Sequence, residues 1–145
     1  MDFIVKTIEY GSPEYEASID LRNDLFRKPW GLDIRDEDLS SDKFMKMYGL
    51  YDKDKLIATT FIAHKEDKVC QIKSVAIAKS YQRKGLGKFM MQYAEDIAKS
   101  DGYEKVFIMG RVSAKDFYEK IGYITLSEPF DYHTIPHIYM EKNLI

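Results

Sequence analysis

The chain has 145 residues, of which 45% are hydrophobic and 32% charged, and its formal net charge is −2 at pH 7. This length fits one domain, residues 1–145, with a substantial core, and the near-neutral charge gives no basic field for nucleic acid or an acidic membrane surface. The single cysteine, Cys70, excludes an intramolecular disulfide and a four-cysteine zinc site. It lies in an apolar stretch, so we expect a buried strand thiol rather than a nucleophile.

Residues 1–10 lack the charged segment and the long apolar run of a signal peptide. No stretch approaches the roughly 18 apolar residues of a membrane span. We therefore expect a cytoplasmic protein without a membrane partner.

The N-terminal part of the chain predicts a strand, a helix and a loop. Residues 3–10 carry apolar side chains at both odd and even positions, which favours a strand. Ser12 and Pro13 have the pattern of an N-cap and a first helical residue, and the amphipathic helix that follows ends before Pro29. The polar residues 30–42 predict a loop, with a short helix running into residues 44–47.

Three β-like runs with polar turns between them come next and predict an antiparallel meander. They are residues 48–51, 56–64 and 69–78. The remaining elements are a helix, a short strand, a second helix and two closing strands. They are residues 85–100, 105–109, 114–121, 123–126 and 136–142. Gly102 and Gly122 suit left-handed helix ends, and Ser113 with Asp116 has capping-box spacing.

The order of these elements predicts the fold class. Residues 69–109 read as strand, helix, strand, and such a crossover places its two strands in parallel. We therefore predict an α/β (α+β mixed) fold. It has a mostly antiparallel sheet of six to seven strands, helices on both faces and one parallel strand–helix–strand unit.

The most informative segment is residues 75–88, where an apolar strand leads into a basic, glycine-bearing turn that opens a helix. The first N–H groups of a helix have no internal partners and lie at the positive end of its dipole. Gly85 and Gly87 let an anion approach the backbone, and Arg83, Lys84 and Lys88 add positive charge. The pattern predicts a phosphate or pyrophosphate site, although a solvated basic helix start is the alternative. Its spacing is neither that of nucleotide-hydrolase phosphate loops nor G-x-G-x-x-G.

The run Gln82-Arg83-Lys84-Gly85-Leu86-Gly87 resembles the Q/R-x-x-G-x-G/A motif of the GNAT (Gcn5-related) N-acetyltransferase family. Residues 114–123 resemble that family's later A-x-x-F-Y-x-K-x-G-F/Y segment. The two motifs stand in the expected order with a helix and a strand between them, and the resemblance covers about residue 56 to the C-terminus. It implies an acetyltransferase that uses acetyl-CoA as co-substrate and needs no metal.

The resemblance also implies where the coenzyme lies. Backbone amides of residues 82–88 would hold the pyrophosphate, and residues 75–77 would pair with the pantetheine arm as an added strand. A bulge there would open a slot for the thioester, and a backbone N–H would stabilise the oxyanion. The residues assigned to the coenzyme are Val75, Ala76, Ile77, Gln82, Arg83, Lys84, Gly85, Leu86, Gly87 and Lys88. Ser113 stands near a frequent asparagine of the family and either contacts the coenzyme or caps the next helix.

Tyr118 matches the family tyrosine that returns a proton to the thiolate leaving group. The alternative is packing alone, because Ala114, Phe117, Tyr118 and Ile121 form one apolar helix face. No general base follows firmly from the sequence. We prefer His137, whose imidazole interrupts an apolar strand, and a water chain is another route. The further candidates are His64, His133, Asp20, Asp24 and Glu128.

Acceptor recognition is expected from the first helix and the loop after it, with Arg22 and Trp30 as binding residues. Further candidates for the lining are Arg27, Tyr132 and Tyr139. Alternatively, Trp30 fills the core and the arginines are solvated. The acidic residues 33–38 either attract a cationic amine or form a solvated surface.

The function predicted from the sequence is N-acetyl transfer from acetyl-CoA to a primary amine, by direct attack in a ternary complex. The acceptor is expected to be a small molecule, since the chain leaves little room for a peptide-binding extension. The alternatives are a non-catalytic acyl-CoA-binding or sensor module and a protein-interaction domain. A homodimer paired through strands is an arrangement that fold analogy leaves open.

Overall fold

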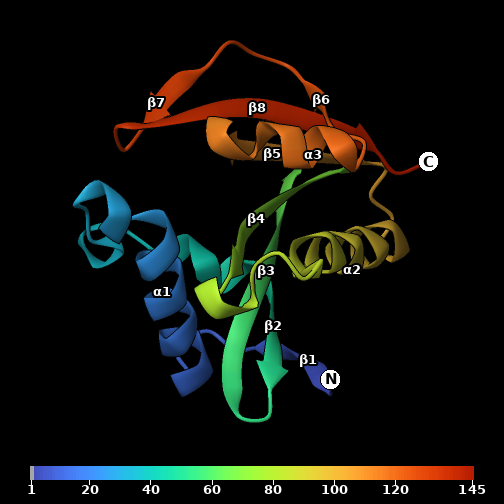
Figure 1. Cartoon of the computed structure of the whole chain (residues 1–145). Helices are drawn as coiled ribbons and strands as arrows, with labels where there is room; N and C mark the ends of the chain where they lie inside the picture. The colour runs from blue at the N-terminus through green and yellow to red at the C-terminus, as the bar shows by residue number, and fades with distance from the viewer. Residues whose placement is uncertain (1) are drawn as a thin grey trace.

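The computed structural model describes residues 2–145 and contains one mixed sheet with helices on both of its faces (Figure 1). The strand order is β1-β2-β3-β4-β5-β8-β6, and β7 pairs with β8. The strands are β1 (Phe3–Ile8), β2 (Lys46–Asp52), β3 (Lys55–Glu66), β4 (Val69–Ile77), β5 (Lys105–Arg111), β6 (Ile124–Thr125), β7 (Phe130–Tyr132) and β8 (Ile135–Asn143). The predicted fold class is confirmed, with eight strands in the described part of the chain instead of six to seven.

The helices follow the sequence prediction closely. They are α1 (Pro13–Phe26), α2 (Leu86–Ser100) and α3 (Lys115–Lys120), with the 3-10 turns η1 (Lys28–Trp30), η2 (Ile34–Asp36), η3 (Ser40–Phe44), η4 (Lys79–Tyr81) and η5 (Val112–Ala114). Ser12 is the N-cap of α1 as predicted, and its hydroxyl accepts a hydrogen bond from the Tyr15 N–H at 3.1 Å. None of the helices in residues 2–145 combines the length and low polarity that a membrane crossing requires.

The crossover β4-α2-β5 makes its two strands parallel, while the other strand pairs are antiparallel. The parallel pairing is short. It joins three pairs of residues, and the last of them is Gln71 with Phe107. Beyond that point β4 and β5 diverge, so that two half-sheets meet only along this seam (Figure 1).

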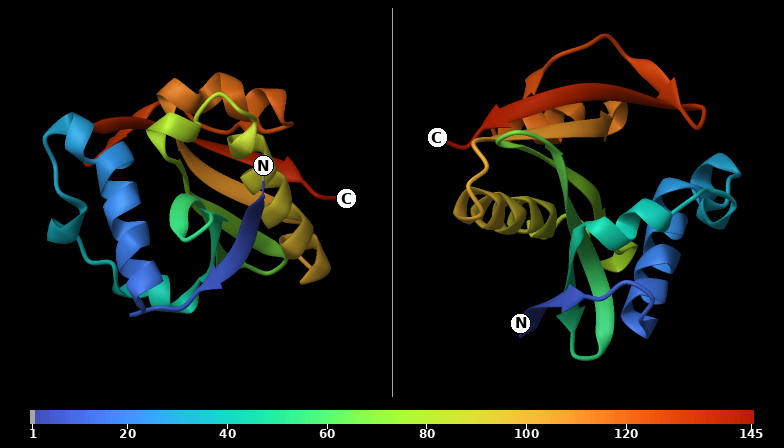
Figure 2. Two further views of the ribbon diagram at one scale, coloured as in Figure 1. Left: turned by 60° about the horizontal axis from the view of Figure 1, so that its bottom comes forward. Right: turned by 180° about the vertical axis from the view of Figure 1, so that it is seen from behind.

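The helices bury different faces of the sheet (Figure 2). Helix α1 packs through Tyr15 and Ile19 against Phe61 on one face, whereas α2 and α3 cover the other. Side chains alternate along a strand, and Val106 and Ile108 of β5 belong to the cluster under α2. Arg111, at the end of the same strand, therefore lies on the α1 face.

Arg22 of α1, which the sequence analysis assigns to acceptor binding, has a structural partner. Its side chain is buried, and Nη1 donates to Asp42 Oδ2 at 2.9 Å. The Tyr15 hydroxyl donates to the same oxygen at 2.8 Å, and the guanidinium carbon lies 4.8 Å from the centre of the Phe61 ring. Through this ion pair, Arg22 joins α1 to η3 on the α1 face of the sheet.

We expect Asp42→Ala to lower the free energy of unfolding by about 3 to 5 kcal/mol, because it leaves the Arg22 charge buried without a counter-charge. The check is chemical denaturation of both proteins. Asp20→Ala is the matched control, because it removes a carboxylate from an ion pair with Arg35 that lies on the surface. The control should change stability by less than about 1 kcal/mol. Equal losses in the two variants would contradict the structural role of Asp42.

One local prediction is wrong, one alternative is excluded, and one strand was not foreseen. Ser113 does not cap α3, because it lies within η5 and the N-cap residue is Ala114, which makes no side-chain capping hydrogen bond. Trp30 does not fill the core, since its side chain is 46% exposed. Strand β7 was not predicted at all. It is joined to β8 by His133 and Thr134, both with positive φ, and this pair lacks the Asn-Gly type of signature that such turns favour.

Candidate active site

The space between the diverging strands β4 and β5 is the centre of the candidate site, and we call it the slot. It is bounded by residues 72–77 of β4 and 108–111 of β5, which are not paired with each other. A bulge in β4 accompanies the divergence, because Thr59 pairs with Ala76 while Phe61 pairs with Lys73. Ser74 lies in the bulge with φ of +54°, and its carbonyl accepts a hydrogen bond from Thr59 Oγ1 at 2.7 Å. The bulge thus keeps the β4 edge directed away from β5.

Backbone groups of β4 face this slot. The Ala78 N–H donates to Ile57 O of β3 at 2.8 Å, so the backbone polar groups of Ala78 point toward β3. Successive residues of a strand point their backbone N–H and C=O groups to opposite edges. The backbone groups of Ile77 and Val75 therefore point toward the slot. The Ile77 carbonyl accepts a hydrogen bond from Gln82 Nε2 at 2.9 Å. The N–H groups of Val75 and Ile77 therefore face a space that β5 leaves open.

The turn that opens α2 lies at the end of this strand. Arg83 and Gly85 both have positive φ, at +63° and +80°, and the first hydrogen bond of the helix runs from the Phe89 N–H to Gly85 O at 3.1 Å. The amides before Phe89 in this turn are consequently left without helical acceptors. Such a concave run of N–H groups at a helix N-terminus is a site for an anion.

The residues around that turn complete the anion site. The side chains of Arg83, Lys84 and Lys88 are exposed, so their charges are available to a ligand. Gly85 has open space where a side chain would begin, whereas a β-carbon at Gly87 would lie 3.3 Å from the ring of Phe117. Gly87 therefore allows α2 and α3 to approach each other, and Gly85 provides the left-handed turn.

Tyr118 of α3 lies beside the end of β5. A β-carbon at Gly110 would come within 3.0 Å of its ring, and Phe117 and Tyr123 pack against the ring edge-to-face. Burial raises the pKa of Tyr118 to about 12, while the charge of Arg111 opposes this rise. The phenol is therefore protonated at neutral pH. No described residue is hydrogen bonded to its hydroxyl, so packing and proton donation are both compatible with its position.

His137 of β8 is buried, and it lies opposite Arg111 of β5. Its Nδ1 is 2.7 Å from the Ile135 carbonyl oxygen. A carbonyl only accepts, so a neutral ring carries its proton on Nδ1 and leaves Nε2 free to accept one. Burial lowers the pKa of His137, and the charges of Arg27 and Arg111 add to this effect. The ring is therefore neutral at pH 7.

The other proposed bases lie at the surface. His64 is exposed on β3, and its Nδ1 is hydrogen bonded to the Tyr103 hydroxyl. It pairs with Cys70, which lies in the paired part of β4 and not in the slot. Three carboxylates are also exposed, and two of them have lysine or arginine partners. They are Asp20, Asp24 and Glu128. Cys70 itself is buried as predicted, and burial raises the pKa of its thiol to about 11.

Polar contacts join the end of α1 to the turn between β7 and β8. Arg27, which ends α1, binds Glu37 through Nε at 2.5 Å and Nη2 at 3.1 Å. His133, in the turn between β7 and β8, reaches the same carboxylate with Nε2 at 3.4 Å from Oε1. The Tyr132 ring lies 5.9 Å from the Arg27 guanidinium carbon, and Tyr139 packs on Phe107. The structure thus joins Arg27 and Tyr132, and the Trp30 N–H donates to the Arg27 carbonyl oxygen at 2.9 Å.

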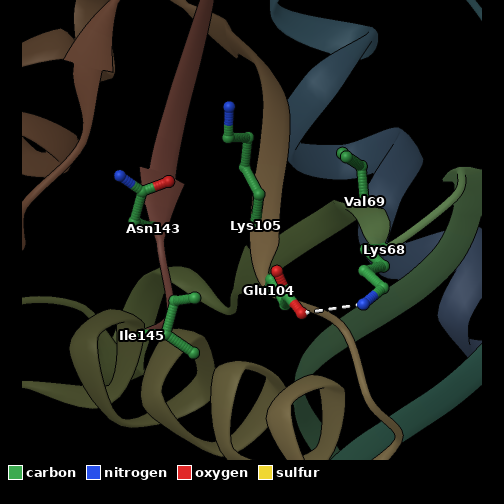
Figure 3. Close-up of a pocket in the computed structure, with 6 residues that line it drawn as sticks. All are labelled: Lys68, Val69, Glu104, Lys105, Asn143 and Ile145. Carbon is green, nitrogen blue, oxygen red and sulfur yellow. Dashed lines mark hydrogen bonds and ion pairs between the residues drawn. The ribbon is translucent and has the colours of Figure 1, made fainter.

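A hollow of about 280 Å³ lies elsewhere, at the other end of β4 and β5 (Figure 3). It is lined by Lys68, Val69, Glu104, Lys105, Asn143 and Ile145. Lys68 Nζ and Glu104 Oε2 form an ion pair of 3.2 Å at its rim. These residues surround the paired end of the seam, so this hollow is separate from the slot.

Known proteins similar to this chain include acetyltransferases. A family model described as "Acetyltransferase (GNAT) domain" matches residues 33–144. A provisionally assigned acetyltransferase of Bacillus subtilis (strain 168) is 40% identical over 72 residues, which are 50% of this chain and 49% of that protein. The chain spans about half the length of the curated relatives it matches.

Solved structures agree with this result. A provisionally assigned N-acetyltransferase of Lactobacillus plantarum superposes with a TM-score of 0.83 at 28% identity, over 97% of this chain and 99% of that one. An acetyltransferase of Bacillus subtilis in complex with CoA shares the fold, with a TM-score of 0.74 at 16% identity over 99% and 100% of the two chains. With a family match over more than half of its residues and this fold, the chain belongs to the GNAT acetyltransferase family.

Proposed function

We propose that the protein transfers an acetyl group from acetyl-CoA to a primary amine of a small acceptor, which attacks the thioester directly. The observation that carries this proposal is the slot between β4 and β5, which ends at the anion site of α2. An extended pantetheine arm suits the backbone N–H groups of Val75 and Ile77, because it pairs as a strand does. The pyrophosphate suits the left-handed turn at Arg83 and Gly85.

The chain's own residues then supply the chemistry. Bound acetyl-CoA provides the thioester carbonyl, and the N–H of Val75 or Ile77 donates to the negative charge that develops on its oxygen. Tyr118 donates from its hydroxyl toward the departing sulfur, since its raised pKa keeps the phenol protonated. His137 accepts the proton of the attacking amine on Nε2. Holding both reactants in one slot contributes much of the rate.

The pH dependence of turnover tests the role of His137. In the wild type, kcat should fall on the acid side with an apparent pKa below the ordinary histidine value of about 6.5, because burial lowers the pKa of this ring. The titratable neighbours of His137 are Arg27, Arg111 and His133, and a positive charge on any of them acts in the same direction. His137→Gln should lower kcat about 100-fold and abolish this acid limb.

Two controls accompany that pH profile. His64→Gln, at the exposed histidine beyond the seam, should retain both the rate and the acid limb. Thermal unfolding at each pH separates loss of catalysis from loss of structure. Stability should decrease as the pH falls below about 6.5, because the unfolded ring takes up a proton more readily than the buried one. An unchanged acid limb in His137→Gln would remove His137 from the mechanism.

The function itself is tested in two steps. Calorimetric titration with acetyl-CoA measures coenzyme binding, and release of free thiol in the presence of a broad amine panel measures transfer. We expect binding, and release that depends on an amine. Binding without release for every amine would support a non-catalytic acyl-CoA sensor instead. An absence of binding would contradict both functions.

A further inference from the structure

Two buried arginines and one partly buried arginine lie on the α1 face, and the partly buried one, Arg111, lacks a counter-charge among the described residues. Arg22 is paired with Asp42 and Arg27 with Glu37. Arg111 has neither a carboxylate nor another side-chain acceptor among the described residues. Within residues 2–145 the Arg111 side chain makes one hydrogen bond, from Nη1 to the carbonyl of Leu25 at 3.4 Å, and a guanidinium has five N–H donors.

The surroundings of Arg111 do not compensate its charge. Its guanidinium carbon lies 5.0 Å from the centre of the Phe26 ring, at the end of α1. Burial lowers the pKa of Arg111, and the charge of Arg27 lowers it further. His137, opposite it on β8, is neutral, and Glu37 is already occupied by Arg27 and His133. A desolvated charge without a partner is costly, so a ligand that supplies the missing negative charge would bind here.

Arg111 also lies next to the predicted reaction centre. The preceding residue, Gly110, contacts the ring of Tyr118 on the α3 face, while Arg111 extends on the α1 face. Directly opposed residues of antiparallel strands have β-carbons about 5 Å apart. Arg111 and His137 are such a pair, so one small acceptor can contact both side chains. An acceptor that enters from the α1 face would therefore meet a guanidinium and a proton acceptor side by side.

We infer that Arg111 binds a carboxylate of the acceptor, and that the acceptor is a small amine with its carboxylate close to the amino group, as in a free amino acid. A carboxylate matches the planar fork of a guanidinium in shape and in its single charge. The Phe26 ring beside it suits an acceptor with an apolar side chain. This inference rests on the proposed function and specifies its substrate class.

The test compares each amino acid of a panel with its own carboxamide, in which the amine is kept and the negative charge is removed. The wild type should acetylate the best amino acid with a kcat/KM about 10- to 100-fold above that of its carboxamide, which is the range expected for a charge-assisted hydrogen-bonded pair. Arg111→Gln should raise KM for the amino acid by a similar factor and change KM for the carboxamide much less. Arg111→Lys should fall between the two, since it retains the charge but not the fork.

Arg35→Gln is the matched control, because Arg35 lies on the surface in ion pairs with Glu16 and Asp20. It should leave both acceptors unaffected. An equal loss for the amino acid and the carboxamide in Arg111→Gln would mean that Arg111 only fastens the end of α1, and would overturn the inference. A wild type that does not prefer the carboxylate would overturn it too.

If no amine is acetylated, the proposed function fails, and the inference is tested separately by binding. The protein saturated with CoA is titrated calorimetrically with the same amino acids and carboxamides. Binding that requires the carboxylate and is lost in Arg111→Gln and weakened in Arg111→Lys would support the site. Equal affinities for the two members of each pair, or no binding of either, would overturn it.

Discussion

Tyr118→Phe is expected to lower kcat about 100-fold while leaving the affinity for acetyl-CoA unchanged. The substitution removes the hydroxyl and keeps the ring, so the contacts with Gly110, Phe117 and Tyr123 remain. General acids contribute about 10²- to 10⁴-fold, and we expect the lower end. The pKa of about 12 makes this phenol a hydrogen-bond donor that gives up its proton reluctantly. The measurements are steady-state kinetics and calorimetric titration with acetyl-CoA.

Tyr93→Phe is the matched control for that experiment. Tyr93 lies on α2, where its ring packs against Tyr48, and no hydrogen bond engages its hydroxyl among the described residues. The control should change kcat less than about twofold. If Tyr118→Phe matches the control, Tyr118 serves packing alone, and the departing thiolate is protonated by solvent.

Gly85→Glu is expected to weaken acetyl-CoA binding by about 100-fold or more, again by calorimetry. Two effects add. The backbone at Gly85 has φ of +80°, which costs a residue with a side chain about 1 to 2 kcal/mol. The new carboxylate also stands at the N-terminal end of α2, where it repels a pyrophosphate and occupies the unpaired amides itself.

The matched control is Gly102→Glu, at the other end of the same helix. Gly102 has φ of +94° and, like Gly85, has open space where a side chain would begin. The two variants should therefore lose similar stability on thermal unfolding. Only Gly85→Glu should lose the coenzyme. Equal loss of binding in both would mean that the substitutions act through the stability of α2, and the pyrophosphate would not be held at this turn.

Much of the fold could be predicted from the sequence because its signals are local. Helix α2 has a clear apolar face and a glycine at each end, and Gly102 and Gly122 adopt the expected left-handed conformation. The change from short alternating runs to a strand–helix–strand pattern was sufficient to predict the parallel pair. The bulge in β4 followed only from the family resemblance, since Ser74 carries no glycine signal for its positive φ.

The ion pairs of Arg22 and Arg27 could not be predicted, because they join residues that are far apart in the chain. Arg22 finds Asp42 and Arg27 finds Glu37, and the sequence gives no spacing rule for such pairs. The same reasoning explains why Arg111 was not singled out. What distinguishes it is the lack of a counter-charge, which becomes visible only once the partners of the other arginines are known. Strand β7 was missed because His133 and Thr134 form a tight turn without the residues that favour one.

The seam that ends at Gln71 and Phe107 has a consequence for the uncomplexed protein. Past this point β4 and β5 are two sheet edges inside the molecule, and exposed edges with free backbone groups are the usual starting points for aggregation. Here helices α1 and α2 both contact β4 next to these edges, one on each face of the sheet (Figure 2). An extended ligand that pairs with these edges, as proposed for the pantetheine arm, would complete the sheet and cover the free backbone groups.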